Sequence, residues 1–149
     1  MRTMSRNSVR YYLLSLVLLA TIAYVLGLTG SRWYFLWGNT VFHFAGGLLF
    51  GALTAEYYAS EFGRLSQPLR IICIVSIVTC IGVIWEFHEF ILSQSALSSG
   101  GAKFIGDLRD TINDLLMDML GGITAALVFW RSSNARVGFE AGSKSDQVS

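Results

Sequence analysis

The sequence predicts an all-α integral membrane protein, a bundle of four transmembrane helices with both termini in the cytoplasm. Of its 149 residues, 53% are hydrophobic and 14% are charged, whereas roughly a quarter of the residues are charged in soluble globular proteins. Four apolar stretches approach the roughly 20 residues that a helix needs to cross the hydrocarbon core of a bilayer. The 11 lysines and arginines are also unevenly placed around these stretches, and their distribution orients the bundle.

The first expected span covers residues 11–28 and follows three arginines, Arg2, Arg6 and Arg10. Positive charge followed by an apolar run also begins a secretory signal peptide. The segment after the run, Gly-Leu-Thr-Gly at residues 27–30, does not match the small-residue pattern of a cleavage site. We therefore expect a retained signal-anchor helix.

The other three expected spans cover residues 37–59, 71–92 and 111–130. Together with the first span they form a predicted transmembrane domain of residues 1–130. The remaining segment, residues 131–149, is polar. It is expected to be a flexible cytoplasmic tail.

The basic residues decide the predicted orientation, because short loops rich in Lys and Arg stay in the cytoplasm. Only Arg32, Lys103 and Arg109 fall on one side of the expected bundle. The opposite side carries Arg2, Arg6, Arg10, Arg64, Arg70, Arg131, Arg136 and Lys144. Both termini of this multi-pass protein are therefore predicted on the cytoplasmic side of the inner membrane, and the Ser/Gly-rich loop 93–106 on the outer side.

Acidic residues are concentrated in the second half of the expected bundle. Residues 1–55 contain no acid, whereas residues 56–118 contain eight. Glu86 and Glu89 lie three residues apart and share one face of the third span. In the fourth span the acids repeat at spacings of three and four residues, so they also share a face. These acids are Asp107, Asp110, Asp114 and Asp118.

Three spans bring an ionisable side chain to the same depth. His43, Glu86 and Asp114 each lie about 9–10 Å inside the expected outer end of their helix, at 1.5 Å per residue. An acid that faces lipid at this depth costs several kcal/mol, so these side chains are expected to face the bundle interior or a water-filled cavity. In the second span, Gly47-x-x-x-Gly51 shares the face of His43 and permits a neighbouring helix to approach closely.

Several carboxylates held close together need a cation or bound protons to relieve their repulsion. The leading hypothesis is a divalent-cation site with Glu86, Asp114 and Asp118 as preferred ligands. Secondary candidates are Glu89, Asp110 and His43. Oxygen ligands favour Mg²⁺, Ca²⁺ or Mn²⁺, and a histidine ligand favours Mn²⁺ or Zn²⁺. If the site is catalytic, His43 and Glu86 are the candidate catalytic residues, while the sequence leaves open whether the protein is an enzyme.

The same residues also have purely structural interpretations. Asp107 and Asp110 fit the first turns of a helix, where the helix dipole favours negative charge. The two glutamates of the third span fit structural hydrogen bonds or a surface salt bridge, and an interior histidine is commonly held by a hydrogen bond. Two other roles for the whole protein stay open: a cation or proton pathway through the same carboxylates, and a non-catalytic subunit that binds a membrane protein partner.

The acidic segment also resembles a known family. Residues 106–122 read Gly-Asp-Leu-Arg-Asp-Thr-Ile-Asn-Asp-Leu-Leu-Met-Asp-Met-Leu-Gly-Gly, and His43-Phe44-x-x-Gly47 and Trp85-Glu86-x-x-Glu89 precede them. This pattern is similar to that of the VanZ-like and YjdF-like group of small multispanning bacterial and archaeal membrane proteins. The resemblance implies an envelope membrane protein, linked in some members to glycopeptide-type antibiotic resistance.

Composition and motifs limit the expected partners. The net charge of +1 favours no nucleic-acid partner, so the expected partners are the lipid bilayer and a lipid-linked substrate or a membrane protein. Cys73 and Cys80 lie roughly 10 Å apart along one helix, beyond the reach of a disulfide. The sequence contains no cofactor-binding motif that we recognise.

Overall fold

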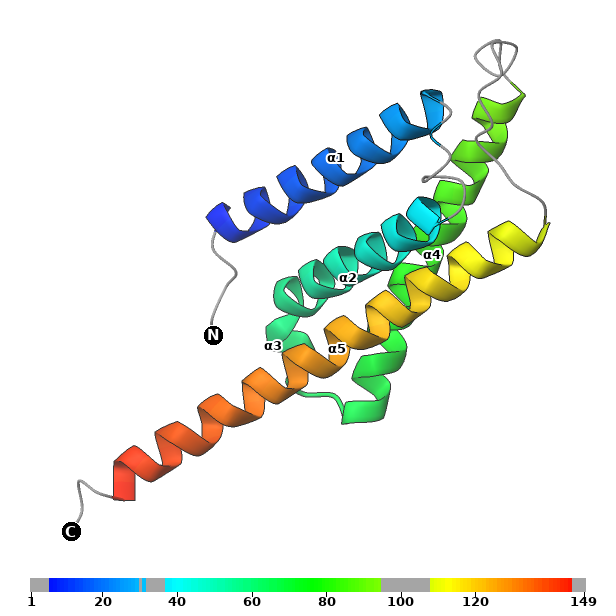
Figure 1. The fold of residues 1–149 in the computed structure, drawn as a ribbon. Helices are drawn as coiled ribbons and strands as arrows, with labels where there is room; N and C mark the ends of the chain where they lie inside the picture. The colour runs from blue at the N-terminus through cyan, green and yellow to red at the C-terminus, as the bar shows by residue number, and fades with distance from the viewer. Residues whose placement is uncertain (1–5, 30, 32–36, 95–107, 146–149) are drawn as a thin grey trace.

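The computed structural model describes residues 6–29, 31, 37–94 and 108–145, with side chains described from Asn7 to Phe129. Over these residues the regular structure is helical (Figure 1). In chain order the helices are α1 (Arg6–Leu28), α2 (Asn39–Tyr57), α3 (Ala59–Phe62), α4 (Gln67–Ser93) and α5 (Leu108–Ser145). The all-α prediction is confirmed for the part of the chain that the structure describes.

Three of the described helices are long and apolar enough to cross a membrane: Asn7–Leu28 in α1, Gln67–Ser93 in α4, and Leu108–Phe129 within α5. They correspond to the first, third and fourth expected spans. Their outer faces carry large exposed hydrophobic side chains, such as Leu14 and Phe87. A membrane helix needs such a surface, because the lipid chains around it are themselves apolar.

The second expected span, residues 37–59, is not among these candidates. The structure forms it as α2, which is followed by a break at Tyr58 and the single turn α3. α2 contains Asn39 and His43 in addition to several glycines, which lower its mean hydropathy. It also lies between the other helices and packs against α1, α4 and α5 (Figure 1). A helix enclosed in this way needs less apolar surface than one that faces lipid.

Local signals explain the sharp turn between α3 and α4. Tyr58 leaves the helical region with φ −96° and ψ 24°, which ends α2. Ser66 is extended with φ −62° and ψ 152°, and Pro68 occupies the first turn of α4, where the missing N–H of proline costs no helical hydrogen bond. The chain therefore reverses direction, and Phe62 is buried under the turn.

The long helices alternate in direction: α1 and α4 run one way, and α2 and α5 run the other (Figure 1). Glycines let α2 and α5 approach closely. A Cβ atom added to Gly47 would lie 2.8 Å from the Cα atom of Asp118, and one added to Gly51 would lie 2.8 Å from the Cβ atom of Ala125. The close approach predicted from the spacing of Gly47 and Gly51 is confirmed.

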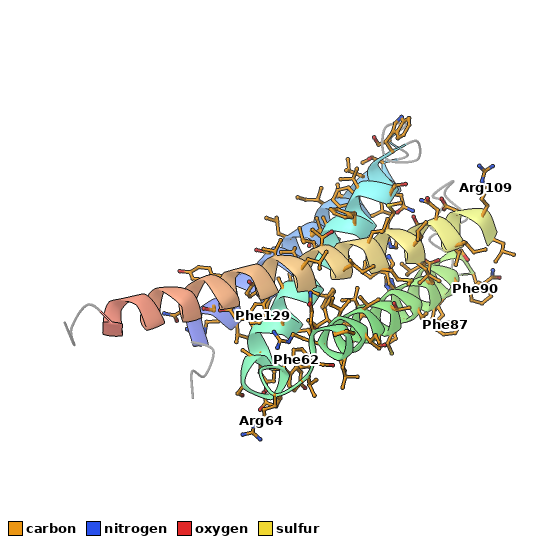
Figure 2. The ribbon with its side chains drawn as sticks, turned by 90° about the horizontal axis from the view of Figure 1, so that it is seen from below. Phe62, Arg64, Phe87, Phe90, Arg109 and Phe129 are labelled. Carbon is orange, nitrogen blue, oxygen red and sulfur yellow. The ribbon has the colours of Figure 1, made fainter. Side chains whose placement is uncertain are left out.

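The bundle interior is divided into an apolar part and a polar part. The apolar core consists of Ala55, Phe62, Ile74, Val78 and Ala126. It lies where α2 ends and α4 begins, near Arg64, whereas Arg109 marks the opposite end of the bundle (Figure 2). The buried polar residues of α4 and α5 lie toward the Arg109 end, because they belong to the last turns of α4 and the first turns of α5.

α5 continues to Ser145, beyond residue 130, where the sequence predicts the end of the transmembrane domain. A helix of 38 residues is about 57 Å long, whereas the hydrocarbon core is about 30 Å thick. Only part of α5 therefore fits within a bilayer, and its apolar part is Leu108–Phe129. The boundary at residue 130 and the flexible tail stay predictions. Most of the expected outer loop, residues 95–107, lies outside the described residues.

Candidate functional site

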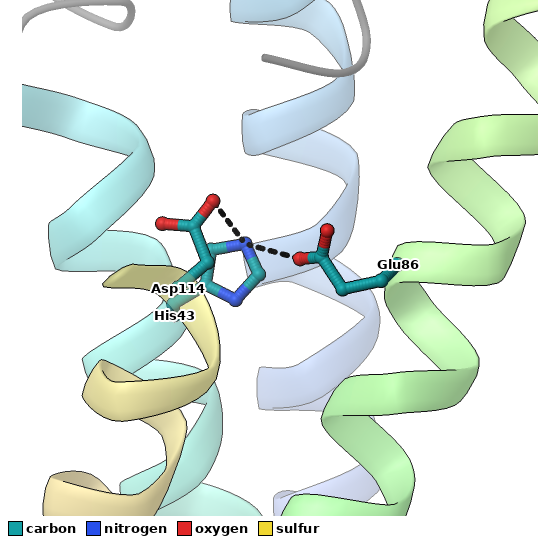
Figure 3. A group of neighbouring side chains, drawn as sticks. All are labelled: His43, Glu86 and Asp114. Atoms are coloured by element: carbon teal, nitrogen blue, oxygen red, sulfur yellow. Dashed lines mark ion pairs between the residues drawn. The ribbon is translucent and has the colours of Figure 1, made fainter. Parts of the chain in front are cut away.

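α2, α4 and α5 each contribute one buried ionisable side chain to a common cluster. His43 is 6% exposed, Glu86 9% and Asp114 1%, and Figure 3 shows the three side chains pointing toward one another. One ligand atom from each residue lies within 4.8 Å of the other two. The Nε2 atom of His43 is 3.6 Å from Oδ2 of Asp114 and 4.0 Å from Oε1 of Glu86. The three residues that the sequence predicts at one depth therefore meet in the structure.

Two glycines allow this convergence. Gly47 lies one turn after His43, where it touches the backbone of Asp118. Gly82 lies one turn before Glu86, and a Cβ atom added there would be 3.2 Å from the Cγ atom of Asp118. Because neither glycine carries a side chain, α5 approaches α2 and α4 closely enough for their polar groups to meet.

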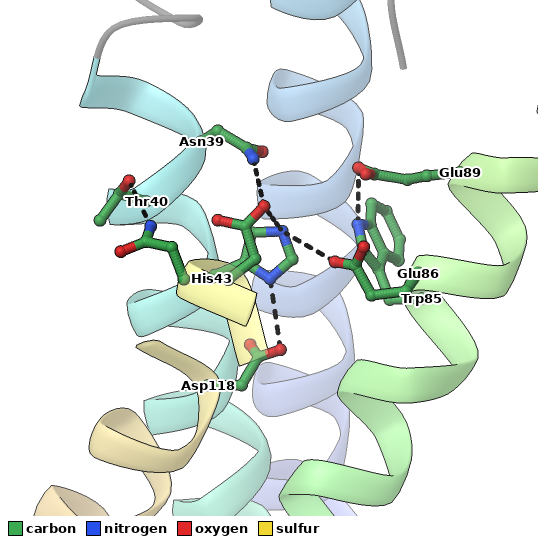
Figure 4. Close-up of polar contacts among 9 residues, drawn as sticks. Asn39, Thr40, His43, Trp85, Glu86, Glu89 and Asp118 are labelled. Carbon is green, nitrogen blue, oxygen red and sulfur yellow. Dashed lines mark hydrogen bonds and ion pairs between the residues drawn. The ribbon is translucent and has the colours of Figure 1, made fainter. Parts of the chain in front are cut away.

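Asp118 lies on the other side of the histidine ring. Its Oδ2 atom is 3.2 Å from Nδ1 of His43 (Figure 4). When Nδ1 carries the proton, it donates a hydrogen bond to Asp118, and Nε2 presents a lone pair toward Glu86 and Asp114. The sequence predicts Asp118 as a ligand beside Asp114, whereas the structure places these two carboxylates at opposite nitrogens of one ring.

Further hydrogen bonds hold the cluster in place. Nδ2 of Asn39 donates to Oδ2 of Asp114 at 2.6 Å, and Nε1 of Trp85 donates to Oε1 of Glu89 at 2.9 Å (Figure 4). Sequence reasoning missed both donors. The signal was present in the spacing, because Asn39 precedes His43 by one helical turn and Trp85 precedes Glu89 by one turn.

Two buried carboxylate oxygens, Oε1 of Glu86 and Oδ1 of Asp114, have no hydrogen-bond donor among the described residues. A buried acceptor without a donor costs about 1–3 kcal/mol. The cluster also has more acids than bases, since His43 is buried together with Glu86, Glu89, Asp114 and Asp118. Such a group, removed from water, requires a bound cation or bound protons. The nitrogen and two carboxylates in reach of one another are ligands that Zn²⁺ or Mn²⁺ accept.

The structure separates the remaining candidates from the group of three. Glu89 is buried but accepts the hydrogen bond from Trp85. Asp110 is exposed in the first turn of α5, which agrees with its helix-dipole interpretation. His88, the other histidine of the chain and not a candidate ligand, lies against the ring of Trp85, with ring centroids 5.2 Å apart. Asp107 lies outside the described residues.

A cavity of about 400 Å³ adjoins the cluster. It is bounded by α1, α2 and α4, and a side chain from α5, that of Asp118, also lines it. His43 belongs both to the wall of this cavity and to the group with Glu86 and Asp114. Its ring therefore lies next to both the cavity and those two carboxylates.

Comparison with known proteins finds a family model described as "Predicted membrane protein (DUF2238)", which matches residues 2–135. No curated protein and no solved structure matches the chain. The matched range includes every residue of the cluster. The finer resemblance to the VanZ-like and YjdF-like group stays a prediction.

Proposed function

The chain belongs to the DUF2238 family of predicted membrane proteins, and on this premise we propose that it binds a divalent cation at His43, Glu86 and Asp114. In this proposal the protein acts on or senses a lipid-linked or envelope component. The observation that carries the metal site is the meeting of three buried ligand atoms, from three helices, within 4.8 Å. A single ion between them would satisfy Oε1 of Glu86, which faces Nε2 of His43 and has no donor among the described residues, and would offset the excess of negative charge.

The ligand set favours Mn²⁺ or Zn²⁺ over Mg²⁺ or Ca²⁺, because it combines an imidazole nitrogen with carboxylate oxygens. Asp118 has a positioning role in this proposal. Metal-binding histidines commonly donate the proton of their other nitrogen to a carboxylate, which fixes the ring and its tautomer. Asp118 faces Nδ1 of His43 and leaves Nε2 for the ion. Asn39 has a similar role toward Asp114, through its 2.6 Å hydrogen bond.

We further propose that α2 is the fourth transmembrane span. Its 19 residues extend about 28 Å, close to the thickness of the hydrocarbon core of a bilayer, about 30 Å. Two polar side chains within it are buried rather than exposed to lipid: His43 and Thr54 are 6% and 7% exposed. With four alternating spans, both termini lie on the same side, and the eight basic residues on that side assign it to the cytoplasm.

The proposed role in the envelope rests on the resemblance to the VanZ-like and YjdF-like group and on the position of the site. The cluster lies in the last turns of α4 and the first turns of α5, toward the Arg109 end of the bundle, which is the outer end in the proposed orientation. A metal held there polarises a phosphate or carbonyl oxygen, or lowers the pKa of bound water, when it acts in catalysis. His43 and Glu86 are the candidate catalytic residues in that case.

The metal content of the purified protein in nanodiscs tests the site. We expect a stoichiometric ion in the wild type, its loss in Asp114→Asn, and its retention in Glu61→Gln, a control whose carboxyl group is exposed on α3. Asp118→Asn should weaken metal binding about 10- to 100-fold. The proposal is overturned if the wild type contains no stoichiometric metal and shows no thermal shift with Mg²⁺, Ca²⁺, Mn²⁺ or Zn²⁺.

Cellular activity separates this proposal from the two alternative roles. A cation or proton pathway would need ionisable groups along the whole bundle. Among the described residues the buried ionisable side chains lie toward the Arg109 end, whereas the Arg64 end contains the apolar core of Ala55, Ile74, Val78 and their neighbours. A non-catalytic partner subunit would keep its activity in Asp114→Asn, provided that the variant folds. Loss of cellular activity in the folded variant, together with loss of metal, supports the metal site.

A further inference from the structure

The cavity beside the cluster is elongated along the bundle. Its volume of about 400 Å³ lies within the range of ligand pockets in proteins. On α2 it extends from Asn39 to Phe50, a distance of about 16 Å at 1.5 Å per residue. This length is about half of the roughly 30 Å hydrocarbon core of a bilayer, which is the depth of one leaflet. Because α2 is proposed to be a transmembrane span, the cavity follows the direction in which lipid chains lie.

The cavity is polar at one end and apolar at the other. Asn39, His43 and His88 line the end near the start of α2 and the last turns of α4. Leu16, Phe50 and Val78 line the opposite end. The wall therefore has the polarity of an amphiphile, with a place for a polar group beside the cluster and a place for hydrocarbon beyond it.

The rim of the cavity faces the bilayer. Ile84 lines the cavity and is also 62% exposed on α4, on the part of the helix that crosses the membrane. Among the described helices, α1 packs mainly against α2, whereas α4 packs against α2 and α5. α1 and α4 therefore flank the cavity, with α2 between them. A hydrocarbon chain in the surrounding membrane can enter the cavity laterally, between α1 and α4.

We propose that this cavity holds one hydrocarbon chain of a membrane lipid, whose polar head lies beside Asn39 and His43. The inference rests on the proposed function, because it makes the lipid the component on which the cation site acts. The apolar wall disfavours a water-soluble ligand. A helix of a partner protein is about 10 Å across, too wide for a narrow cavity lined by three helices of this chain.

Photo-cross-linking in nanodiscs tests the proposal. The probe is phosphatidylglycerol with a diazirine at the end of one acyl chain, and mass spectrometry locates the cross-linked residues. Gly46→Leu fills the cavity from α2, since a Cβ atom at Gly46 meets only ordinary contact, 3.9 Å from Leu19. Ala20→Leu fills it from α1. Val41→Leu is the matched control, because Val41 is 54% exposed on the outer face of α2.

We expect label on Leu19 and Phe50 inside the cavity, in addition to label on lipid-facing residues such as Leu18. The label inside the cavity should be lost in both filled variants and retained in Val41→Leu. If Gly46→Leu unfolds, as its thermal transition will show, Ala20→Leu decides. Label on Leu18 without label on Leu19 or Phe50 overturns the proposal, as does label that persists in both filled variants or a cross-link to a second protein chain.

The metal content of the same samples distinguishes this inference from the proposed function. A bound metal without label in the cavity overturns the lipid site alone. Label in the cavity without bound metal overturns the cation site and leaves the hydrocarbon chain in place.

Discussion

Two neighbouring glycines on α2 provide a direct test of how the polar cluster is assembled. Replacing either Gly46 or Gly47 by alanine adds one methyl group and gives the same gain in helix propensity, about 0.5–1 kcal/mol. The surroundings differ. At Gly46 the nearest atom to the new Cβ is Cδ2 of Leu19 at 3.9 Å, whereas at Gly47 the new Cβ lies 2.8 Å from Cα and 2.9 Å from the carbonyl carbon of Asp118.

A Cβ atom cannot remain 2.8 Å from a backbone carbon, so in Gly47→Ala the helices α2 and α5 must separate. Overpacking of this kind costs about 1–3 kcal/mol. Because the gain in helix propensity is common to both variants, their difference in unfolding free energy should equal the overpacking cost alone. In the wild type, Oδ2 of Asp118 lies 3.2 Å from Nδ1 of His43. The separation of the helices should lengthen this distance and lower the metal content of the protein.

Denaturation by sodium dodecyl sulfate in mixed micelles measures the two unfolding free energies, and elemental analysis measures the metal content. Gly46→Ala should be as stable as the wild type or slightly more stable, and Gly47→Ala should be less stable than Gly46→Ala by the stated amount. Equal stability of the two variants, with unchanged metal content, would refute the close contact between Gly47 and the backbone of Asp118.

Three other perturbations test the polar network. Asn39→Ala removes the donor to Asp114 and should cost about 1–3 kcal/mol of stability, with weaker metal binding; an unaltered metal affinity would contradict its positioning role. Trp85→Phe keeps an aromatic ring but removes the donor to the buried Glu89, so denaturation should show a loss of about 1–3 kcal/mol with metal content retained. Loss of the metal would instead make Glu89 part of the cation site. Removal of the ion by a chelator should lower the unfolding free energy of the wild type by about 2.7 kcal/mol, relative to protein with the free ion at 100 times its Kd. The chelator should leave the unfolding free energy of Asp114→Asn unchanged, because that variant binds no ion.

Much of the candidate site could be predicted from helical spacing. The shared face of Glu86 and Glu89, and that of Asp114 and Asp118, follow from separations of three and four residues. Both pairs are buried in the structure. The common depth of His43 with Glu86 and Asp114 follows from distances along each helix, because every residue advances the chain by the same rise.

α2 corresponds to the second expected span, residues 37–59, but its hydropathy signal is weaker than that of the other three. Its polar residues and glycines lower its mean hydropathy, and it is not among the three helices that qualify as spans by length and composition. The structure encloses it between α1, α4 and α5. Hydropathy measures the average of all faces of a helix, whereas lipid contacts only the outward face, so a central helix gives a weak signal.

The sequence by itself determined the membrane class, the faces that carry the acids, and the three helices whose ionisable residues meet. These properties depend on composition and on the fixed geometry of a single helix. Only the tertiary structure decided that Asp118 faces Nδ1 of His43 while Glu86 and Asp114 face Nε2, and that a cavity lies beside this ring. Such arrangements depend on how far each helix is rotated and how closely it approaches its neighbours. Contacts between small residues, such as Gly47 against the backbone of Asp118, set that rotation and distance, and the spacing within one helix does not contain them.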